Sequence, residues 1–447
     1  MRSRTLSLAC GVLAALLLAL VPVSSVGAAV QPGCAGTPAT LPPDQQPRNV
    51  ILMIGDGMGP ESVELGRLFA GALEMEALDE GAPGSATTQD ISGGTTDSAA
   101  SATALATGCK TYDGAISVDV NGAELGTAWE RAHGLGKASG ILSSVFLADA
   151  TPGVWAAHAD SRYNYTEIAT EQARSGVEVL LGAGAQYYRP QGAYGTGGPN
   201  LINEMRDAGY DYVRKASELA KADGPKLLGF FGGATMTYAL DRPLSPTLTE
   251  PTLAQMTDKA LELLSTDAEG FFLVVEGGAI DWLAHKKDAA GVMHDVAAFD
   301  DAIAVARAFA EADGETLLVV TADHETGGLQ VGADVDLPFL RGIRATTDII
   351  WSAIEGGMTV EKAMRTYGGI TNLSASERRT ISSCASDLGI ADVLSARGGV
   401  RWGWGSCEGA HHTDTPVPVF ATGPGAASFD GDLDNAVIGQ LILDAVA

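Results

Sequence analysis

The sequence predicts an α/β fold in which a central, mainly parallel (mixed) sheet carries helices on both faces. Short apolar runs rich in β-branched residues recur without polar alternation, which is typical of strands buried on both faces. Amphipathic stretches of helical length lie between these runs. Most runs end at a polar residue, as expected where ligands bind at the carboxyl ends of parallel strands.

Five apolar runs are the expected strands, in the order in which they occur. They are Val50–Ile54, Ile141–Phe146, Phe271–Val275, Leu317–Thr321 and Val417–Ala421. The clearest helical stretches are Leu253–Leu264 and Met293–Ala310. Strands that alternate with helices in this way indicate strand–helix–strand units and therefore a sheet with many parallel neighbours.

Acidic residues and a histidine follow these strands. Asp56 follows the first run, Asp149 the second and Glu276 the third, while Asp323 and His324 follow the fourth. Several carboxylates that meet at one sheet edge repel one another unless cations hold them. The pattern therefore predicts a metal site at this edge.

The segment Thr95–Ser98 predicts the start of a helix that runs through an Ala-rich stretch and ends at Gly108. The first turn of such a helix offers free backbone N–H groups and partial positive charge, which suit a phosphate. From this segment alone, Ser98 is equally compatible with an ordinary helix cap and with a reactive hydroxyl.

Further candidate metal ligands come from residue spacing. Asp281 and His285 are four positions apart, so on a helix they share one face. Asp and His ligands without a cysteine thiolate suit zinc in a catalytic setting. An all-oxygen set, for which Asp56, Thr151 and Glu276 are the candidates, suits magnesium instead.

The composition bounds the function. The chain has 447 residues, of which 46% are hydrophobic, and a formal net charge of −27. Such an acidic surface repels nucleic acid, so we do not expect a nucleic-acid-binding protein. The acidity itself is explained by solubility, although some carboxylates are the candidate metal ligands.

The amino terminus predicts export. Arg2 and Arg4 precede an apolar run over Leu8–Val21, and small residues follow it up to Ala29, which is typical of a secretory signal peptide. We expect a protein without a membrane anchor in the periplasm or the medium. The cysteines outside the leader are Cys34, Cys109, Cys384 and Cys407. Export favours two disulfides, and all three pairings remain open.

Seven segments occur in the order of the motifs of the alkaline phosphatase family, which they resemble. They are NVILMIGDGMG (49–59), TTDSAASATALATGCKTYDGA (95–115), ADATPGVWAAHADSR (148–162), VEVLLGAGA (177–185), VEGGAIDWLAH (275–285), VTADHETGG (320–328) and HTDTPVPVFATGP (412–424). The resemblance implies hydrolysis of phosphate monoesters through a phosphorylated Ser98, with release of inorganic phosphate. It also implies a homodimer.

The resemblance also implies a ligand set for two Zn2+ ions and one Mg2+ ion. The first zinc would be held by Asp281, His285 and His412, the second by Asp56, Asp323 and His324, and the magnesium by Asp56, Thr151 and Glu276, with Asp149 reaching it through water. Arg162 matches the substrate arginine of the family, whose planar fork can hold two phosphoryl oxygens.

Two positions need a choice. His411 precedes His412, and the spacing to Val417 favours His412 as the ligand. Trp282 stands next to Asp281, where some relatives carry lysine. Because an indole supplies no positive charge beside the phosphate, we expect weaker phosphate retention and easier product release than in lysine-bearing relatives.

The predicted organisation is a signal peptide over 1–29, an extended segment over 30–47, a catalytic α/β domain over 48–333 and 410–447, and a family-variable insertion near the active site over 334–409. Two other functions stay open at this stage. One is a diesterase or sulfatase on the same scaffold, and the other is an exported phosphate-binding protein without catalysis.

Overall fold

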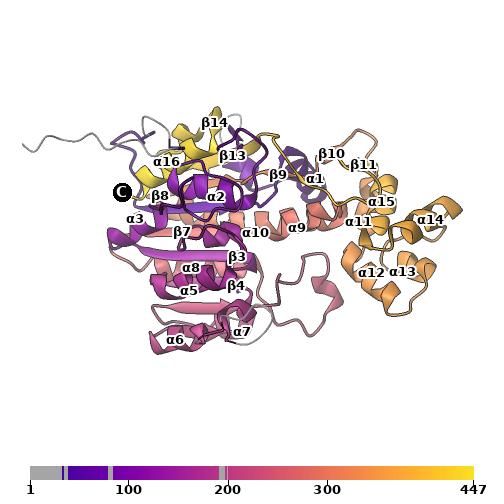
Figure 1. Cartoon of the computed structure of the whole chain (residues 1–447), viewed down its shortest axis with the longest axis horizontal. Helices are drawn as coiled ribbons and strands as arrows, with labels where there is room; N and C mark the ends of the chain where they lie inside the picture. Colours follow the sequence, from indigo (N-terminus) through magenta and orange to yellow (C-terminus); the bar gives the residue numbers. More distant parts are fainter. Residues whose placement is uncertain (1–32, 35–38, 79–83, 191–196, 199) are drawn as a thin grey trace, which may run out of the picture. The chain divides into compact units, whose positions relative to one another are not determined.

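The computed structural model describes residues 33–34, 39–78, 84–190, 197–198 and 200–447, so the predicted signal peptide lies outside it. Within these ranges, ten strands form one mixed sheet in the order β14-β2-β13-β8-β1-β7-β3-β4-β6-β5 (Figure 1). The sheet strands are β1 (Asn49–Ile54), β2 (Gly84–Thr87), β3 (Ala138–Phe146), β4 (Val179–Ala183), β5 (Asp211–Val213), β6 (Leu227–Phe230), β7 (Phe271–Glu276), β8 (Thr316–Thr321), β13 (Val417–Thr422) and β14 (Asp432–Asp434). The predicted α/β class is confirmed.

Helices pack on this sheet and around its edges. The helices before β8 are α1 (Pro60–Ala70), α2 (Ser98–Thr107), α3 (Ala128–Gly134), α4 (Ala150–Gly153), α5 (Tyr165–Ser175), α6 (Leu201–Asp207), α7 (Ala216–Leu219), α8 (Leu253–Leu264), α9 (Ala279–His285) and α10 (Ala289–Asp313). Those after it are α11 (Leu337–Gly342), α12 (Thr347–Glu355), α13 (Val360–Thr366), α14 (Ala375–Cys384), α15 (Asp387–Arg397) and α16 (Asn435–Ala445). Single 3₁₀ turns are η1 (Met75–Ala77), η2 (Ala185–Tyr188), η3 (Arg242–Leu244) and η4 (Ala426–Phe429).

The centre of the sheet is buried on both faces, as the unbroken apolar runs predict. Every residue of β1, β7 and β8 is buried. Strand β1 lies between β7 and β8 and is parallel to both, with Ile54 opposite Glu276 on one side and Thr321 on the other. The ends of these three strands are therefore level at one edge of the sheet.

The predicted helices are confirmed, with one difference in length. Helix α8 has the predicted bounds, but α10 begins at Ala289, four residues before the prediction, and ends at Asp313, three residues after it. The side chain of Asp288 accepts a hydrogen bond from the backbone N–H of Gly291 and so caps the start of α10. Because the first residues, from Ala289 to Val292, are all buried, they show no amphipathic period that a sequence reading could detect.

Strand β13 is antiparallel to its neighbours β8 and β2, which makes the sheet mixed. The residues before β13 therefore lie at the edge where β1, β7 and β8 end. One of them, His412, belongs to β12 (His412–Thr413), which pairs with β9 (Glu325–Thr326) just after β8. Antiparallel pairing thus brings a late histidine to the predicted site.

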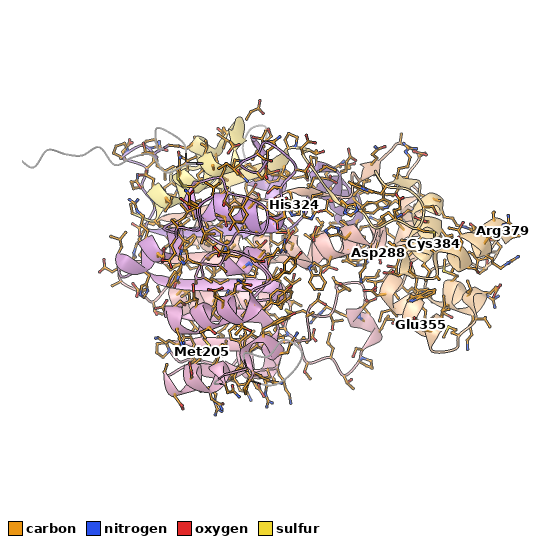
Figure 2. All side chains as sticks on the ribbon, in the orientation of Figure 1. Met205, Asp288, His324, Glu355, Arg379 and Cys384 are labelled. Atoms are coloured by element: carbon orange, nitrogen blue, oxygen red, sulfur yellow. A yellow bond between two sulfur atoms is a disulfide. The ribbon has the colours of Figure 1, made fainter. Side chains whose placement is uncertain are left out.

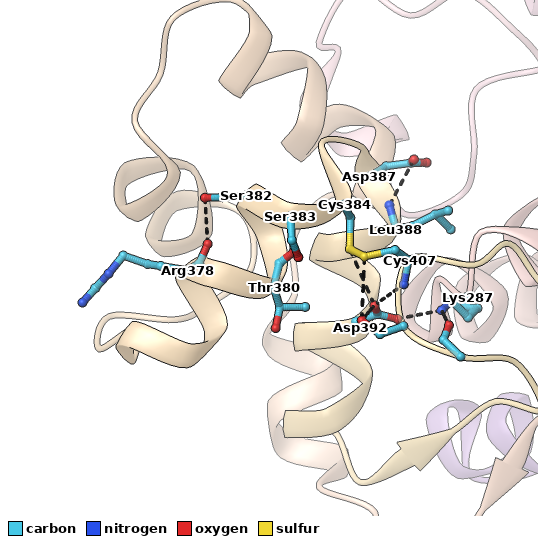
Figure 3. Close-up of a disulfide and its surroundings, with 12 residues drawn as sticks. Lys287, Arg378, Thr380, Ser382, Ser383, Cys384, Asp387, Leu388, Asp392 and Cys407 are labelled. Carbon is cyan, nitrogen blue, oxygen red and sulfur yellow. Dashed lines mark hydrogen bonds and ion pairs between the residues drawn. A yellow bond between two sulfur atoms is a disulfide. The ribbon is translucent and has the colours of Figure 1, made fainter.

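Residues 334–409 form a group of helices, α11 to α15, which Figure 1 shows in orange. A short ribbon of β10 (Gln330–Val331) and β11 (Val400–Arg401) closes its base. The Cys384–Cys407 disulfide joins α14 to the loop that leads back to β12 (Figure 3). Beside it, the Lys287 ammonium donates to Asp392 at 2.6 Å.

The second disulfide, Cys34–Cys109, attaches the N-terminal segment beyond the end of α2. The four cysteines outside the leader therefore form the pairs Cys34–Cys109 and Cys384–Cys407. This is one of the three pairings that the sequence left open. Among the described helices, none has both the length and the apolar character needed to cross a bilayer.

Candidate active site

The ends of β1, β7 and β8 carry the side chains that the sequence predicted to meet. Asp56 lies two residues after β1, Glu276 is the last residue of β7, and Asp323 and His324 follow β8 (Figure 2 labels His324). Asp149 stands at the equivalent place after β3, where it is the N-cap of α4. The structure brings all of them to one edge of the sheet.

The first group consists of Asp281, His285 and His412, whose candidate ligand atoms all lie within 4.8 Å of one another. Helix α9 presents Asp281 and His285 on one face, with 3.3 Å between Asp281 Oδ1 and His285 Nε2. The Nε2 atoms of His285 and His412 are 3.0 Å apart. Residues 127 positions apart therefore face one small volume.

The tautomers in the first group follow from the neighbours of the rings. His285 Nδ1 lies 2.6 Å from the carbonyl oxygen of Ala410, and His412 Nδ1 lies 2.9 Å from that of Thr96. A carbonyl only accepts, so each Nδ1 carries the proton and each Nε2 presents a lone pair. Two lone pairs and a carboxylate that face one another repel unless a cation lies between them, so the donor set fits a metal ion.

The second group consists of Asp56, Asp323 and His324, and all three residues are buried. His324 Nε2 lies 3.6 Å from Asp56 Oδ1 and 3.3 Å from Asp323 Oδ2. Asp56 Oδ1 is buried and lacks a hydrogen-bond partner. A buried carboxylate oxygen without a partner costs free energy, which a cation would offset, so this group also fits a metal ion.

Ser98 is the first residue of α2, and its hydroxyl faces the second group. Asp97 caps the helix by accepting from the backbone N–H of Ala100 at 2.9 Å, and Gly108 ends it in the left-handed region with φ 68°. Ser98 Oγ lies 3.1 Å from His324 Nε2 and is only 3% exposed. The rings of His324 and His412 stack 3.6 Å apart, so the hydroxyl is close to both groups.

The electrostatics of the site support a cationic occupant. Burial, and then the carboxylate of Asp323, raise the pKa of Asp56 well above its ordinary value. Burial raises the pKa of Asp323 to about 7 and that of Glu276 to about 8. Burial also lowers the pKa of His324 well below its ordinary value. Without added positive charge, the three carboxyl groups would therefore tend to lose the ionised form that binds metal, whereas His324 stays in the neutral form that binds metal.

An all-oxygen set adjoins the second group. Thr151 Oγ1 lies 3.3 Å from Asp56 Oδ2, and Glu276 Oε1 is buried without a hydrogen-bond partner. The other oxygen of Glu276 accepts a short hydrogen bond from Ser143, a residue of β3 that the sequence reading did not consider. Hydroxyl and carboxylate oxygens suit magnesium. Asp149 does not join either metal group of the described residues and faces Arg162 instead.

Arg162 spans two carboxylates. One guanidinium nitrogen lies 3.1 Å from Asp97 Oδ2 and the other 3.1 Å from Asp149 Oδ1. Burial acts to lower the pKa of Arg162, but the carboxylates of Asp149 and Asp97 outweigh it and raise the pKa. The planar fork is thus held next to Ser98 by its neighbours, which orients it for an anion with two oxygens.

Thr326 is a site residue that sequence reasoning missed. It is fully buried, and its hydroxyl donates to Asp281 Oδ1 at 2.6 Å. His324 Nδ1 lies 3.2 Å from the hydroxyl oxygen of Thr326. One hydroxyl therefore connects the two metal groups. Its only signal in the sequence is its place two residues after His324, which does not separate it from any other strand-end threonine.

Two further predictions concern the rim of the site. His412 enters the first group, whereas His411 is exposed with its ring 5.5 Å from that of Trp404. Trp282 is half-buried, lines the cavity that adjoins the first group, and contacts Phe146 edge-on at 6.2 Å. The indole is therefore at the mouth of the site.

Paired Asp and His groups beside a serine hydroxyl, at the carboxyl edge of a mainly parallel sheet, define the class of metal-dependent hydrolases. The alkaline phosphatase family model matches residues 47–447, and the chain belongs to that family. It is therefore a phosphomonoesterase.

Known relatives agree with this assignment. The chain is 34% identical over 425 residues to alkaline phosphatase 3 of Bacillus subtilis (strain 168), covering 89% of each chain. It is 32% identical over 446 residues to the streptomycin-6-phosphate phosphatase of Streptomyces griseus, covering 87% of this chain and 88% of the relative. The cold-active alkaline phosphatase from the psychrophile Shewanella sp. superposes with a TM-score of 0.79 at 31% identity, covering 89% of this chain and all of that one.

Proposed function

We propose that the chain hydrolyses phosphate monoesters through a phosphoserine at Ser98, with two zinc ions and one magnesium ion. The observation that carries the proposal is the position of Ser98 Oγ, 3.1 Å from His324 Nε2 at the N-terminus of α2. The buried hydroxyl lies beside two candidate metal groups and Asp97 already caps the helix, which supports a role in nucleophilic attack rather than in helix capping.

The residues divide between the three ions according to their donor atoms. Asp281, His285 and His412 would hold the first zinc, Asp56, Asp323 and His324 the second, and Asp56, Thr151 and Glu276 the magnesium, with Asp149 acting through water. The ions would supply positive charge that lowers the pKa of a hydroxyl or water and stabilises negative oxygens.

The residues of the chain then account for the remaining steps. Ser98 Oγ forms a bond to phosphorus while the ester oxygen leaves with the alcohol, and water later cleaves the phosphoserine, releasing inorganic phosphate and restoring the hydroxyl. Arg162 binds two equatorial phosphoryl oxygens, and the first N–H groups of α2 face the same charge. Asp97 and Asp149 hold Arg162 in place for this contact.

The central experiment traps the covalent intermediate. Enzyme that is turning over p-nitrophenyl phosphate is quenched with acid and digested, and its peptides are weighed by mass spectrometry. We expect phosphate on Ser98 and none on Ser101, which lies one turn further along α2. The variant Ser98→Ala should lose about 1,000-fold or more in kcat/KM. Phosphate on Ser101, or full activity of Ser98→Ala, would contradict the proposal.

Metal identity and substrate class need separate tests. Metal analysis of purified protein should give zinc and magnesium in a ratio near two to one, and chelation should abolish activity. The enzyme should prefer p-nitrophenyl phosphate to its bis-ester, since a diester preference would indicate the phosphodiesterase alternative. The homodimer, export after cleavage near Ala29, and the division into a catalytic domain and a variable insertion over 334–409 stay predictions.

A further inference from the structure

A cavity of about 700 Å3 adjoins the first metal group. One side is formed by that group together with Arg162 and its two carboxylate partners. Neither Ser98 nor the second group lines this cavity. Ser98 Oγ contacts His324 of the second group, so under the proposed function an in-line attack makes the alcohol depart on the side of the first group, where this cavity lies.

A second part of the lining consists of aromatic rings, which we call the aromatic wall. It is made of Phe146, Tyr163, Tyr165, Tyr187 and Trp282. These residues come from the end of β3, the loop before α5, the start of α5, the turn η2 and helix α9. Because Tyr163 and Tyr165 belong to one continuous stretch, four separate segments contribute one aromatic surface to the same cavity.

The rings of the wall contact one another in sequence. Phe146 stacks on Tyr187 with centroids 4.5 Å apart and an interplanar angle of 21°, and it meets Tyr165 edge-on at 5.5 Å. Tyr165 lies 5.1 Å from Tyr187 and 6.3 Å from Tyr163. Trp282 extends the cluster at 6.2 Å from Phe146. Such mutual contacts hold the ring faces and edges in fixed positions.

The outermost ring is not buried by the fold. Tyr163 is 73% exposed, more than any other large hydrophobic side chain among the described residues. Phe146 and Tyr187, by contrast, are buried and form the innermost part of the wall, its floor. A graded surface, buried at the floor and open at the mouth, suits a flat apolar group that enters from solvent.

Polar groups also line the cavity, among them the hydroxyls of the three tyrosines of the wall. Apart from the rings, the lining there includes Gln186, Ala234 and Lys286. The ammonium of Lys286 is already paired with Asp348 by a short contact. A leaving group covered with hydroxyls buries less apolar area against the rings, so it gains less from contact with them than a flat apolar ring does.

We propose that the aromatic wall is the leaving-group subsite and that it favours phosphate monoesters whose alcohol carries a flat apolar ring. This inference rests on the proposed function, because it assumes that phosphate binds at Ser98 and Arg162. The ring of the alcohol packs against Tyr163 and Tyr165, while the ester oxygen points to the first metal group.

The test uses substrates whose leaving groups are all primary alcohols, so that leaving-group chemistry differs little. These substrates are methyl phosphate, benzyl phosphate and glucose 6-phosphate. We expect kcat/KM for benzyl phosphate to exceed that for methyl phosphate by about 10-fold or more, since ring contacts and apolar burial both contribute. Glucose 6-phosphate, which has a ring of similar size covered with hydroxyls, should show no such advantage.

Variants of the outermost ring test the wall itself. Tyr163→Ser should lower the ratio of benzyl to methyl kcat/KM about 3- to 10-fold, chiefly through KM, whereas Tyr163→Phe keeps the ring and should retain the ratio. Leu135→Ser is the matched control, because Leu135 is also exposed but lies before β3 at the opposite edge of the sheet. This control should leave the ratio unchanged.

The outcomes separate this inference from the proposed function. Failure to hydrolyse any of the three substrates would refute the proposed function. Hydrolysis of all three with a benzyl to methyl ratio near one, an equal advantage for glucose 6-phosphate, or an unchanged ratio in Tyr163→Ser would overturn the aromatic subsite alone.

Discussion

The hydroxyl of Thr326 offers a direct test of how the two metal groups are coupled. Its proton goes to Asp281 Oδ1, so its oxygen accepts from His324 Nδ1, and His324 then presents the Nε2 lone pair to Asp56 and Asp323. The variant Thr326→Val keeps the shape of the side chain and removes both hydrogen bonds. A carboxylate of one group and an imidazole of the other lose their orientation together.

The size of the effect follows from the contacts that are lost. A hydrogen bond to a charged group contributes about 1.5–3 kcal/mol. Since about 1.4 kcal/mol corresponds to a tenfold change in a binding constant, Thr326→Val should weaken zinc binding by about 10- to 100-fold. The loss should affect binding at both metal groups, because the hydroxyl contacts a candidate ligand of each group.

The assay is competition for zinc against a chelator of known affinity, with activity measured at each free zinc concentration. Thr257→Val is the matched control: Thr257 is equally buried, and its hydroxyl donates to the Leu253 carbonyl on α8, with no contact to either group. This control should bind zinc like the parent. Parental zinc affinity in Thr326→Val, or the same loss in Thr257→Val, would refute the reasoning.

Three further predictions concern phosphate release, pH and the disulfide of the helical segment. Trp282→Lys should lower the inhibition constant for inorganic phosphate, because an ammonium adds charge where the indole has none. In metal-free protein, the raised pKa values of Asp323, about 7, and Glu276, about 8, mean that the folded state binds extra protons. The stability that these two protonated carboxyl groups contribute is therefore fully present near pH 4 and is lost as the pH rises to 8. The Tm of the chelated protein should fall over that range, whereas the Tm of the metal-loaded protein should not. Replacing Cys384 and Cys407, 23 residues apart, by serine should destabilise the helical segment by about 3 kcal/mol, which hydrogen exchange of α14 would measure.

Specific results would contradict each of these predictions. An unchanged or weaker grip on phosphate in Trp282→Lys would refute the account of product release. If the Tm of the chelated protein stays level or rises between pH 5 and pH 8, the two carboxyl groups do not govern its stability in this range. Unaltered exchange of α14 in the serine variant would mean that the Cys384–Cys407 bond contributes nothing to local stability.

The fold and the strand-end residues could be predicted because both are local patterns. The run Val50–Ile54 is apolar throughout because both faces of β1 are covered, and Asp56 follows it at the sheet edge. Helix α8 was predicted with its observed bounds because one face is buried and the other exposed. The start of α10 was missed because a wholly buried helical turn has no such contrast.

The supporting contacts of the site could not be predicted. Thr326, Ser143 and Asp97 contact Asp281, Glu276 and Arg162 from positions 45, 133 and 65 residues away. The sequence around each of these residues does not indicate which residue it contacts. The same holds for the disulfides, because four cysteines allow three pairings until the chain brings Cys34 to Cys109 and Cys384 to Cys407.

By itself, the sequence determined the class of fold, the helix start at Ser98 and the residue types available for metal, because these depend on neighbours along the chain. Only the tertiary structure decided which side chains share one volume. The antiparallel direction of β13 brings His412 to α9, and four segments that are separate in the sequence meet in the aromatic wall. The physical reason is that repulsion between lone pairs, burial of carboxylates and contact between rings act through space, so they exist only once the sheet has set the distances.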